Sequence, residues 1–110
     1  MLEPSPNCVL GPCVKLLAGA WTLEIIYFLK DSPLYFGELK RTLEPVSAKV
    51  LTARLRELEQ RGVVKRSVLE GNPANVEYKL SEMGRELIPV LELFSEVSQR
   101  LKNKFANKPC

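Results

Sequence analysis

The stretch SAKVLTARLRELEQRG, at residues 47–62, carries the clearest structural pattern in the sequence. Leucines recur along it at helical spacing, which predicts a helix from residue 47 to about residue 61 with one apolar face. Ser47 stands where an N-cap residue accepts hydrogen bonds from the first turn, and Gly62 is a natural residue just beyond the last turn. The side chains of this apolar face are Ala48, Leu51, Leu55 and Leu58.

The opposite face of this helix is polar and basic. Projected at about 100° per residue, it carries Lys49, Arg56 and the small Ala53, with Thr52 on one flank. Lys49, Thr52 and Arg56 have the length and the donors to reach base edges or phosphates of DNA, and Ala53 would permit a close approach. The free N–H groups of the first turn, beside Ser47, favour a phosphate.

Positive charge is concentrated around this helix. Residues 38–66 contain eight Lys or Arg against four Asp or Glu, although the whole chain of 110 residues has a net charge of only +3. A local basic excess is the electrostatic footprint of a polyanion binder, but a solvated helix face with Glu–Arg pairs would give the same count. Arg54 and Arg61 flank the apolar stripe and are candidates for pairing with Glu57 instead of contacting DNA.

Shorter patterns lie on both sides of this helix. Prolines break the apolar pattern before it, and after Gly62 the apolar period changes from 3.6 to 2, which predicts a β-hairpin. Ser81 is placed to cap a final helix, which Pro89 should either kink or restart. The expected elements are helices at about 13–17, 21–30, 35–43 and 81–105, and strands at about 64–68 and 76–80 with a tip at 70–75.

These elements predict one mainly α domain with a small β-hairpin, of the α+β class. Their order is that of a winged helix-turn-helix, in which one helix enters the major groove of DNA and the hairpin, or wing, meets the adjacent backbone or minor groove. We expect a flexible N-terminal arm at residues 1–12, this domain at 13–105 and a tail at 106–110. The final helix, about 81–105, carries more apolar residues than a small core needs, which predicts a homodimer.

The composition argues against most enzyme chemistry. The chain has no histidine, which removes His-based triads and His metal ligands, and three cysteines, an odd number that makes no disulfide framework. A glycine-rich phosphate loop is missing as well. We therefore expect no catalytic residues, no cofactor and no metal. The acidic, proline-broken start and the short apolar runs predict neither a secretory signal nor a membrane span, and so a cytoplasmic protein.

From Cys8 to about Leu101 the sequence resembles the HxlR-type family of winged-helix transcription regulators. The similar stretches are WTL at residues 21–23, YFGELKR at 35–41, VSAKVLTARLRELE at 46–59 and VEYKLSEMGREL at 76–87. The resemblance implies a winged helix-turn-helix that binds double-stranded DNA as a homodimer. It also implies that the terminal helices form the interface and that the two recognition helices read a near-palindromic operator.

The sequence departs from the family pattern at three places. The family's Cys-Pro near the start is Cys8-Val9 here, and its Gly-Gly-Lys-Trp is AGAW at residues 18–21, without the lysine. The wing tip, NPAN at residues 72–75, lacks the arginine that family members commonly carry. Wing contacts are therefore expected to be weaker or to be made by Asn72, Asn75 and the neighbouring basic residues Lys65 and Arg66.

Some members of the family respond to oxidants or electrophiles through an N-terminal cysteine. Cys8 matches that position, Cys13 lies five residues further on, and Lys15 could favour a nearby thiolate. An ordinary structural role for these two small residues is an equal alternative.

Two sets of site residues follow. The DNA-binding set is Ser47, Lys49, Thr52, Ala53, Arg56, Lys40, Arg41, Arg66, Asn72 and Asn75. The dimer-interface set is Leu10, Val14, Leu91, Phe94, Val97, Leu101 and Phe105. The alternative function is a winged-helix module that binds protein instead of DNA, but it predicts an apolar or acidic face where Lys49 and Arg56 stand. A thiol enzyme is disfavoured because no base is available to activate a cysteine.

Overall fold

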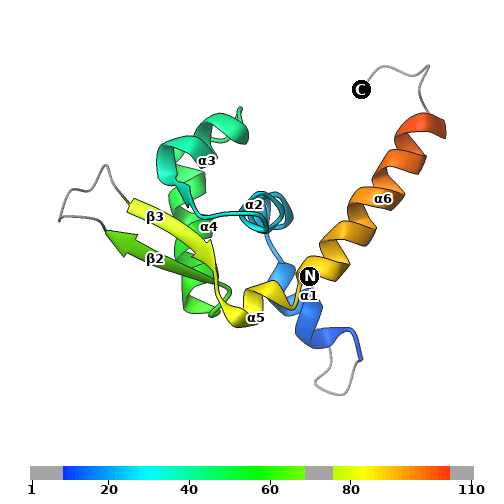
Figure 1. Ribbon diagram of the computed structural model, residues 1–110, viewed down its shortest axis with the longest axis horizontal. Coiled ribbons are helices and arrows are strands. Elements are labelled where there is room, and N and C mark those ends of the chain that lie inside the picture. The colour runs from blue at the N-terminus through cyan, green and yellow to red at the C-terminus, as the bar shows by residue number, and fades with distance from the viewer. Residues whose placement is uncertain (1–8, 69–75, 105–110) are drawn as a thin grey trace.

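A computed structural model describes residues 9–68 and 76–104 of the chain (Figure 1). In the figure the hairpin lies on one side of the molecule and the last helix projects from the other. The helices are α1 Gly11–Leu17, α2 Thr22–Leu29, α3 Phe36–Thr42, α4 Ala48–Gln60, α5 Glu82–Arg85 and α6 Ile88–Lys104. The strands are β1 Leu34–Tyr35, β2 Val64–Val68 and β3 Val76–Leu80.

Helix α4 forms as its sequence predicts. Its three leucines, Leu51, Leu55 and Leu58, are at most 1% exposed. The Ser47 hydroxyl accepts a hydrogen bond from the backbone N–H of Val50 at 3.1 Å, so the predicted N-cap is confirmed. Beyond the helix Gly62 takes a positive φ of 82°, the left-handed conformation in which glycine commonly ends a helix.

The hairpin is part of a three-stranded antiparallel sheet with the order β1-β3-β2. The predicted strands β2 and β3 pair in the register Val64↔Leu80 to Val68↔Val76. The short strand β1, which pairs with β3, was not predicted. The predicted helix start at Tyr35 is wrong by one residue: Tyr35 is extended, and its N–H donates to the Glu38 carboxylate at 2.9 Å as the chain enters α3.

The predicted final helix is two helices. Ser81 caps α5, its hydroxyl accepting from the Gly84 N–H at 3.0 Å, and the chain restarts as α6 at Ile88. Pro89 lies in the first turn of α6, where its missing N–H costs nothing, so the restart is the alternative that the structure confirms. Helix α6 is described to Lys104, and Phe105 lies outside the described residues.

Helix α1 begins at Gly11, two residues before the predicted start, because Pro12 is well suited to the first turn of a helix. Three predicted segments lie outside the described residues: residues 1–8 of the N-terminal arm, the wing tip at 70–75 and the tail at 106–110.

One hydrophobic core joins the sheet, α2, α3 and α4. It extends to the start of α6 through Leu91 and through Leu87, which lies between α5 and α6. Gly84 is required for this packing because a Cβ there would lie 2.3 Å from the carbonyl oxygen of Val63. Within the described residues no single helix is long and apolar enough to cross a membrane. Helices α1 and α2 reach that length and hydropathy only when taken together, and their axes are bent by 89°.

Candidate nucleic-acid interface

The face of α4 that points away from the leucines is open to solvent. Lys49, Ala53 and Arg56 are exposed along it, and Thr52 is half-buried on its flank. Within the described part of the chain, no carboxylate lies within ion-pairing distance of Lys49 or Arg56. The structure therefore brings four predicted DNA-binding residues together on one helix face, with both of its cations available to an anion.

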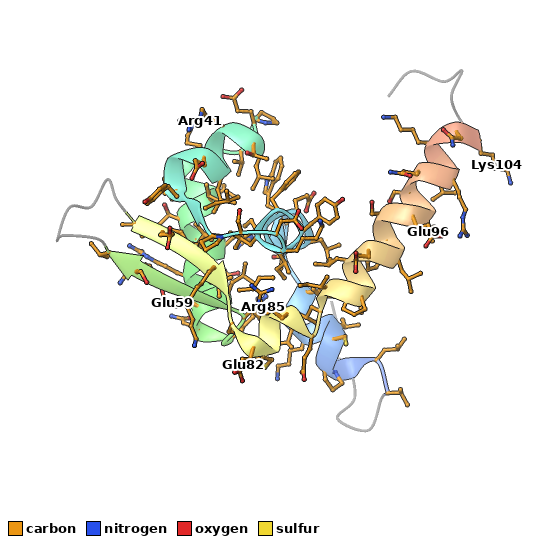
Figure 2. All side chains as sticks on the ribbon, viewed as in Figure 1. Arg41, Glu59, Glu82, Arg85, Glu96 and Lys104 are labelled. Carbon is orange, nitrogen blue, oxygen red and sulfur yellow. The ribbon has the colours of Figure 1, made fainter. Side chains whose placement is uncertain are left out.

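Ser47 and the basic residues of α3 flank this face. The Ser47 hydroxyl already accepts the hydrogen bond of the N-cap. An anion at this end of the helix would therefore be bound by free backbone N–H groups of the first turn, and not by this hydroxyl. On α3, Arg41 is exposed and Lys40 is half-buried. Figure 2 shows Arg41 on the side of α3 that lies away from α6.

The base of the wing adds further positive charge. Arg66 on β2 is exposed, and its Nε lies 3.8 Å from the Glu59 carboxylate at the end of α4. Lys65 is paired directly with Lys79 on β3, and both side chains are exposed. Like charges opposite one another weaken a sheet, so an anionic partner would relieve this repulsion. Asn72 and Asn75 lie outside the described residues.

Tyr78 lies between the wing and α4. Its side chain is 8% exposed, and Arg66 stands opposite it on β2. Burial raises the pKa of Tyr78 above its ordinary value of 10.0, and Glu59 adds to the effect, while Arg66 and Arg56 act in the opposite direction. The phenol is therefore neutral at physiological pH, and it belongs to the same core cluster as the leucines of α4.

The two arginines on the flank of α4 pair with Glu57 as predicted. Arg54 Nη1 lies 2.9 Å from Glu57 Oε1, and Arg61 Nη2 lies 3.6 Å from Glu57 Oε2. Both arginines also donate to backbone carbonyls of the segment between α1 and α2, and no sequence pattern predicted these contacts. These contacts join residues more than 30 positions apart, and no local spacing could have indicated them.

The predicted interface residues fall into two groups. Five of them are exposed and apolar, on α1 and its approach and on the outer part of α6: Leu10, Val14, Phe94, Val97 and Leu101. Leu91 is 3% exposed and belongs to the core, so its assignment to the interface is wrong: it faces α2 within its own chain. Leu93, 60% exposed, was missed because it lies off the predicted apolar band.

A groove of about 400 Å³ separates the exposed part of α6 from α2. Its walls are mostly apolar, with Tyr27 and Phe28 of α2 facing Phe94 of α6. Apolar and aromatic side chains of both helices therefore line this groove, together with Glu24, Ser95 and Ser98.

Of the two redox candidates, Cys13 is exposed on α1 and Cys8 lies outside the described residues. Within the described residues no group of three or more His, Cys, Asp or Glu side chains could hold a metal ion.

A basic helix packed by its apolar face onto a three-stranded sheet and preceded by a short helix defines a winged helix-turn-helix protein. The sequence model of the HxlR-like helix-turn-helix family matches residues 16–105. The chain belongs to this family, and it is a transcription regulator of the winged-helix type, as its relatives are.

Three known proteins illustrate the similarity. An uncharacterised HTH-type transcriptional regulator of Halalkalibacterium halodurans is 38% identical over 94 residues, which are 84% of this chain and 83% of the relative. The redox regulator HypR in its reduced form has a TM-score of 0.78 at 30% identity, covering 87% of this chain and 95% of HypR. The reduced form of the transcriptional regulator YodB from Bacillus subtilis has a TM-score of 0.69 at 36% identity, covering 93% and 94%. These relatives are regulators, not enzymes.

Proposed function

We propose that this chain binds double-stranded DNA in a sequence-specific manner, with α4 in the major groove and the wing on the adjacent backbone or minor groove. The observation that carries the proposal is the exposed face of α4, where Lys49 and Arg56 have no carboxylate partner among the described residues. In this fold, base edges are read by a helix that packs its apolar face on the core and presents a basic face to the major groove.

The proposal divides the contacts by their role. Lys49, Thr52 and Arg56 reach base edges or nearby phosphates, and Ala53 lets the helix lie close to the groove floor. Outside α4, the phosphate contacts come from Lys40 and Arg41 on α3 and from Arg66 at the wing, with Asn72 and Asn75 at its tip. Lys40 and Arg41 come from the helix before α4 and Arg66 from the strand after it, and in this proposal they meet the phosphate backbones that border the major groove.

We further propose that the chain acts as a homodimer in the cytoplasm. The exposed apolar side chains of α1 and α6 would form a symmetric interface, because such a surface is stable in water when a second copy covers it. Two copies of α4 would then meet successive major-groove turns about 34 Å apart, which requires a near-palindromic operator.

A response to oxidants or electrophiles through Cys8 is the last part of the proposal. Its support is the similarity to HypR, described as a redox regulator, and to YodB, of which a quinone-bound form is known. Cys13 offers a second exposed thiol on α1. An oxidant should change DNA affinity in the native protein and leave the Cys8→Ser variant unchanged. An equal response of the two proteins would exclude Cys8.

The experiment that tests DNA binding is a salt titration with duplexes selected from a random library. Lys49→Ala and Arg56→Ala are compared with Lys104→Ala and Arg85→Ala, which remove the same charges from exposed positions on α6 and α5 (Figure 2). A lost phosphate contact should reduce the log–log salt slope by about 0.9, and a lost base contact should reduce discrimination by about 1–3 kcal/mol. The control variants should bind almost as the native protein does.

Two results would overturn the proposal. The first is a native protein that enriches no sequence from the library. The second is an unchanged salt slope and sequence preference in both α4 variants. Either result would favour a winged-helix module that binds protein.

A further inference from the structure

The flank of α4 opposite Thr52 carries a row of three charged residues that do not face the proposed DNA surface. Arg54, Glu57 and Arg61 lie on successive turns, and the carboxylate of Glu57 is shared by the two arginines. The arginine side chains are 25% and 28% exposed, so the row is partly shielded from solvent. Shielded charge-assisted contacts of fixed geometry hold elements in place better than fully exposed ion pairs do.

Arg61 contacts the end of α1, and Arg54 contacts the segment that joins α1 to α2. Arg61 Nη1 donates to the Ala18 carbonyl at 2.9 Å and lies 3.4 Å from the Leu16 carbonyl. The last carbonyls of a helix have no partner within the helix, so Arg61 acts as a C-terminal cap supplied from more than 40 residues away. Arg54 Nε donates to the Ala20 carbonyl at 2.9 Å, just before α2.

The segment held in this way has an unusual backbone. Gly19 has a φ of 110°, and Trp21 has a φ of 71°, a left-handed conformation that is costly for a bulky side chain. Such a conformation persists only where its surroundings determine it. Besides the two arginines, the Thr22 hydroxyl donates to the Ala18 carbonyl at 3.0 Å.

Helix α1 has few other attachments to the domain. Its side chains are exposed from Pro12 to Lys15, and only Leu16 and Leu17, at its C-terminal end, pack against the core. The end of α1 is therefore the part that is fixed, and the arginines of α4 are its polar attachment.

We propose that Arg54 and Arg61 are positioning residues for DNA recognition, which fix α1 in one orientation relative to the recognition helix. The inference rests on the proposed function, in which α1 contributes to the dimer interface and α4 reads DNA. The two arginines then couple the interface to the reading surface and set the distance and angle between the two copies of α4. They would determine which spacing of half-sites the dimer accepts.

The test substitutes lysine for both arginines, because Arg54→Lys/Arg61→Lys keeps the charge and the long side chains. A lysine ammonium cannot donate from a planar fork in two directions, as Arg54 does to Ala20 and Glu57. The control is Arg100→Lys, which alters an exposed ion pair with Glu96 on α6. All proteins are compared in cooperative thermal unfolding before any DNA measurement.

The probe is a duplex selected by the native protein from a random library, with two derivatives in which one base pair is inserted or deleted between the half-sites. The native protein and Arg100→Lys should bind the derivatives at least about tenfold more weakly than the selected duplex. The double variant should bind all three duplexes within about twofold of one another, at an unchanged salt slope. A merely structural defect would weaken binding to all three duplexes alike and preserve the spacing preference.

The outcomes separate this inference from the proposed function. A native protein that selects no duplex overturns both. A native protein that selects a spaced operator, together with a double variant that keeps the same spacing preference, overturns the inference and leaves the DNA-binding proposal standing. If the double variant does not unfold cooperatively, Arg61→Lys alone decides the matter, since it alters the cap on α1 and leaves the contacts of Arg54 with Ala20 and Glu57 in place.

Discussion

Helices α4 and α6 are both amphipathic, but they use their apolar residues differently. The leucines of α4 are at most 1% exposed, because the sheet and neighbouring helices cover them completely. On α6 only Leu91 is buried, while Phe94, Val97 and Leu101 are 43–50% exposed. In Figure 1 the outer part of α6 projects from the domain, whereas α4 lies against the sheet.

The difference shows which apolar surfaces are buried within a single chain and which are not. The part that would read DNA has its core within one chain, whereas the apolar surface of α6 is left exposed by the residues that the structure describes. A protein built in this way can fold its reading surface before it associates, and it can associate through a surface that the fold does not need. The predictions below test this division, beginning with the largest expected effect.

Replacing the same residue type on the two helices should give unequal losses of stability. Leu55→Ala leaves a cavity in the core and should lower the free energy of unfolding by about 3 kcal/mol. Leu93→Ala, on an exposed position of α6, should change it by less than about 0.5 kcal/mol. Urea unfolding of both variants measures this at a concentration where the native protein is monomeric. Equal losses would show that α6 is as much a part of the fold as α4.

A charge on the outer face of α6 should weaken association without unfolding the domain. Leu101→Glu should cost on the order of 2 kcal/mol of association free energy, because a desolvated charge would replace an apolar contact. Gln99→Glu introduces the same charge at a neighbouring exposed position on another side of the helix and should associate like the native protein. Sedimentation equilibrium measures both. A native dimer that Leu101→Glu leaves intact would place the interface elsewhere.

Loss of the N-cap of α4 should have an intermediate effect on the fold. Ser47→Ala removes the acceptor for the Val50 N–H and should lower the free energy of unfolding by about 1 kcal/mol. Ser47→Asp retains an acceptor and should restore stability, yet its negative charge should weaken DNA binding. If Ser47→Asp unfolds as easily as Ser47→Ala, the hydroxyl contact does not stabilise α4.

Titration of Tyr78 should give the smallest effect. Burial raises its pKa in the folded state, so the contribution to stability is complete below about pH 10 and is lost as the pH rises through the folded-state pKa. Tyr78→Phe should therefore lose less stability than the native protein between about pH 9 and about pH 11, by less than about 1 kcal/mol. Urea midpoints at the two pH values measure this. Parallel losses would mean that the phenol ionises as freely in the fold as outside it.

Local patterns in the sequence predicted most of the elements that carry the proposed DNA-binding residues. Helical spacing and the flanking Ser47 and Gly62 located α4, and period-two alternation located β2 and β3. The strand β1 was missed because two residues, Leu34 and Tyr35, are too few to show a period. These successes and this failure share one cause, which is that a pattern must repeat before it can indicate an element.

Contacts that depend on the folded arrangement could not be predicted. An apolar band on a helix does not show how it is divided between its own core and a partner, so Leu91 was assigned to the wrong side. The hydrogen bond from Arg54 to the Ala20 carbonyl joins residues 34 positions apart. Its existence depends on how α1, α2 and α4 meet, which no short stretch of sequence specifies.

The strand β1 has a consequence for how this regulator can diverge. Because β3 pairs with β1 along one edge and with β2 along the other, the base of the wing is held from both sides. We therefore expect insertions, deletions and substitutions between residues 68 and 76 to leave the pairing of β3 and the core in place. Duplicated genes could acquire new target preferences by changing residues 69–75 alone, while inheriting an unchanged scaffold.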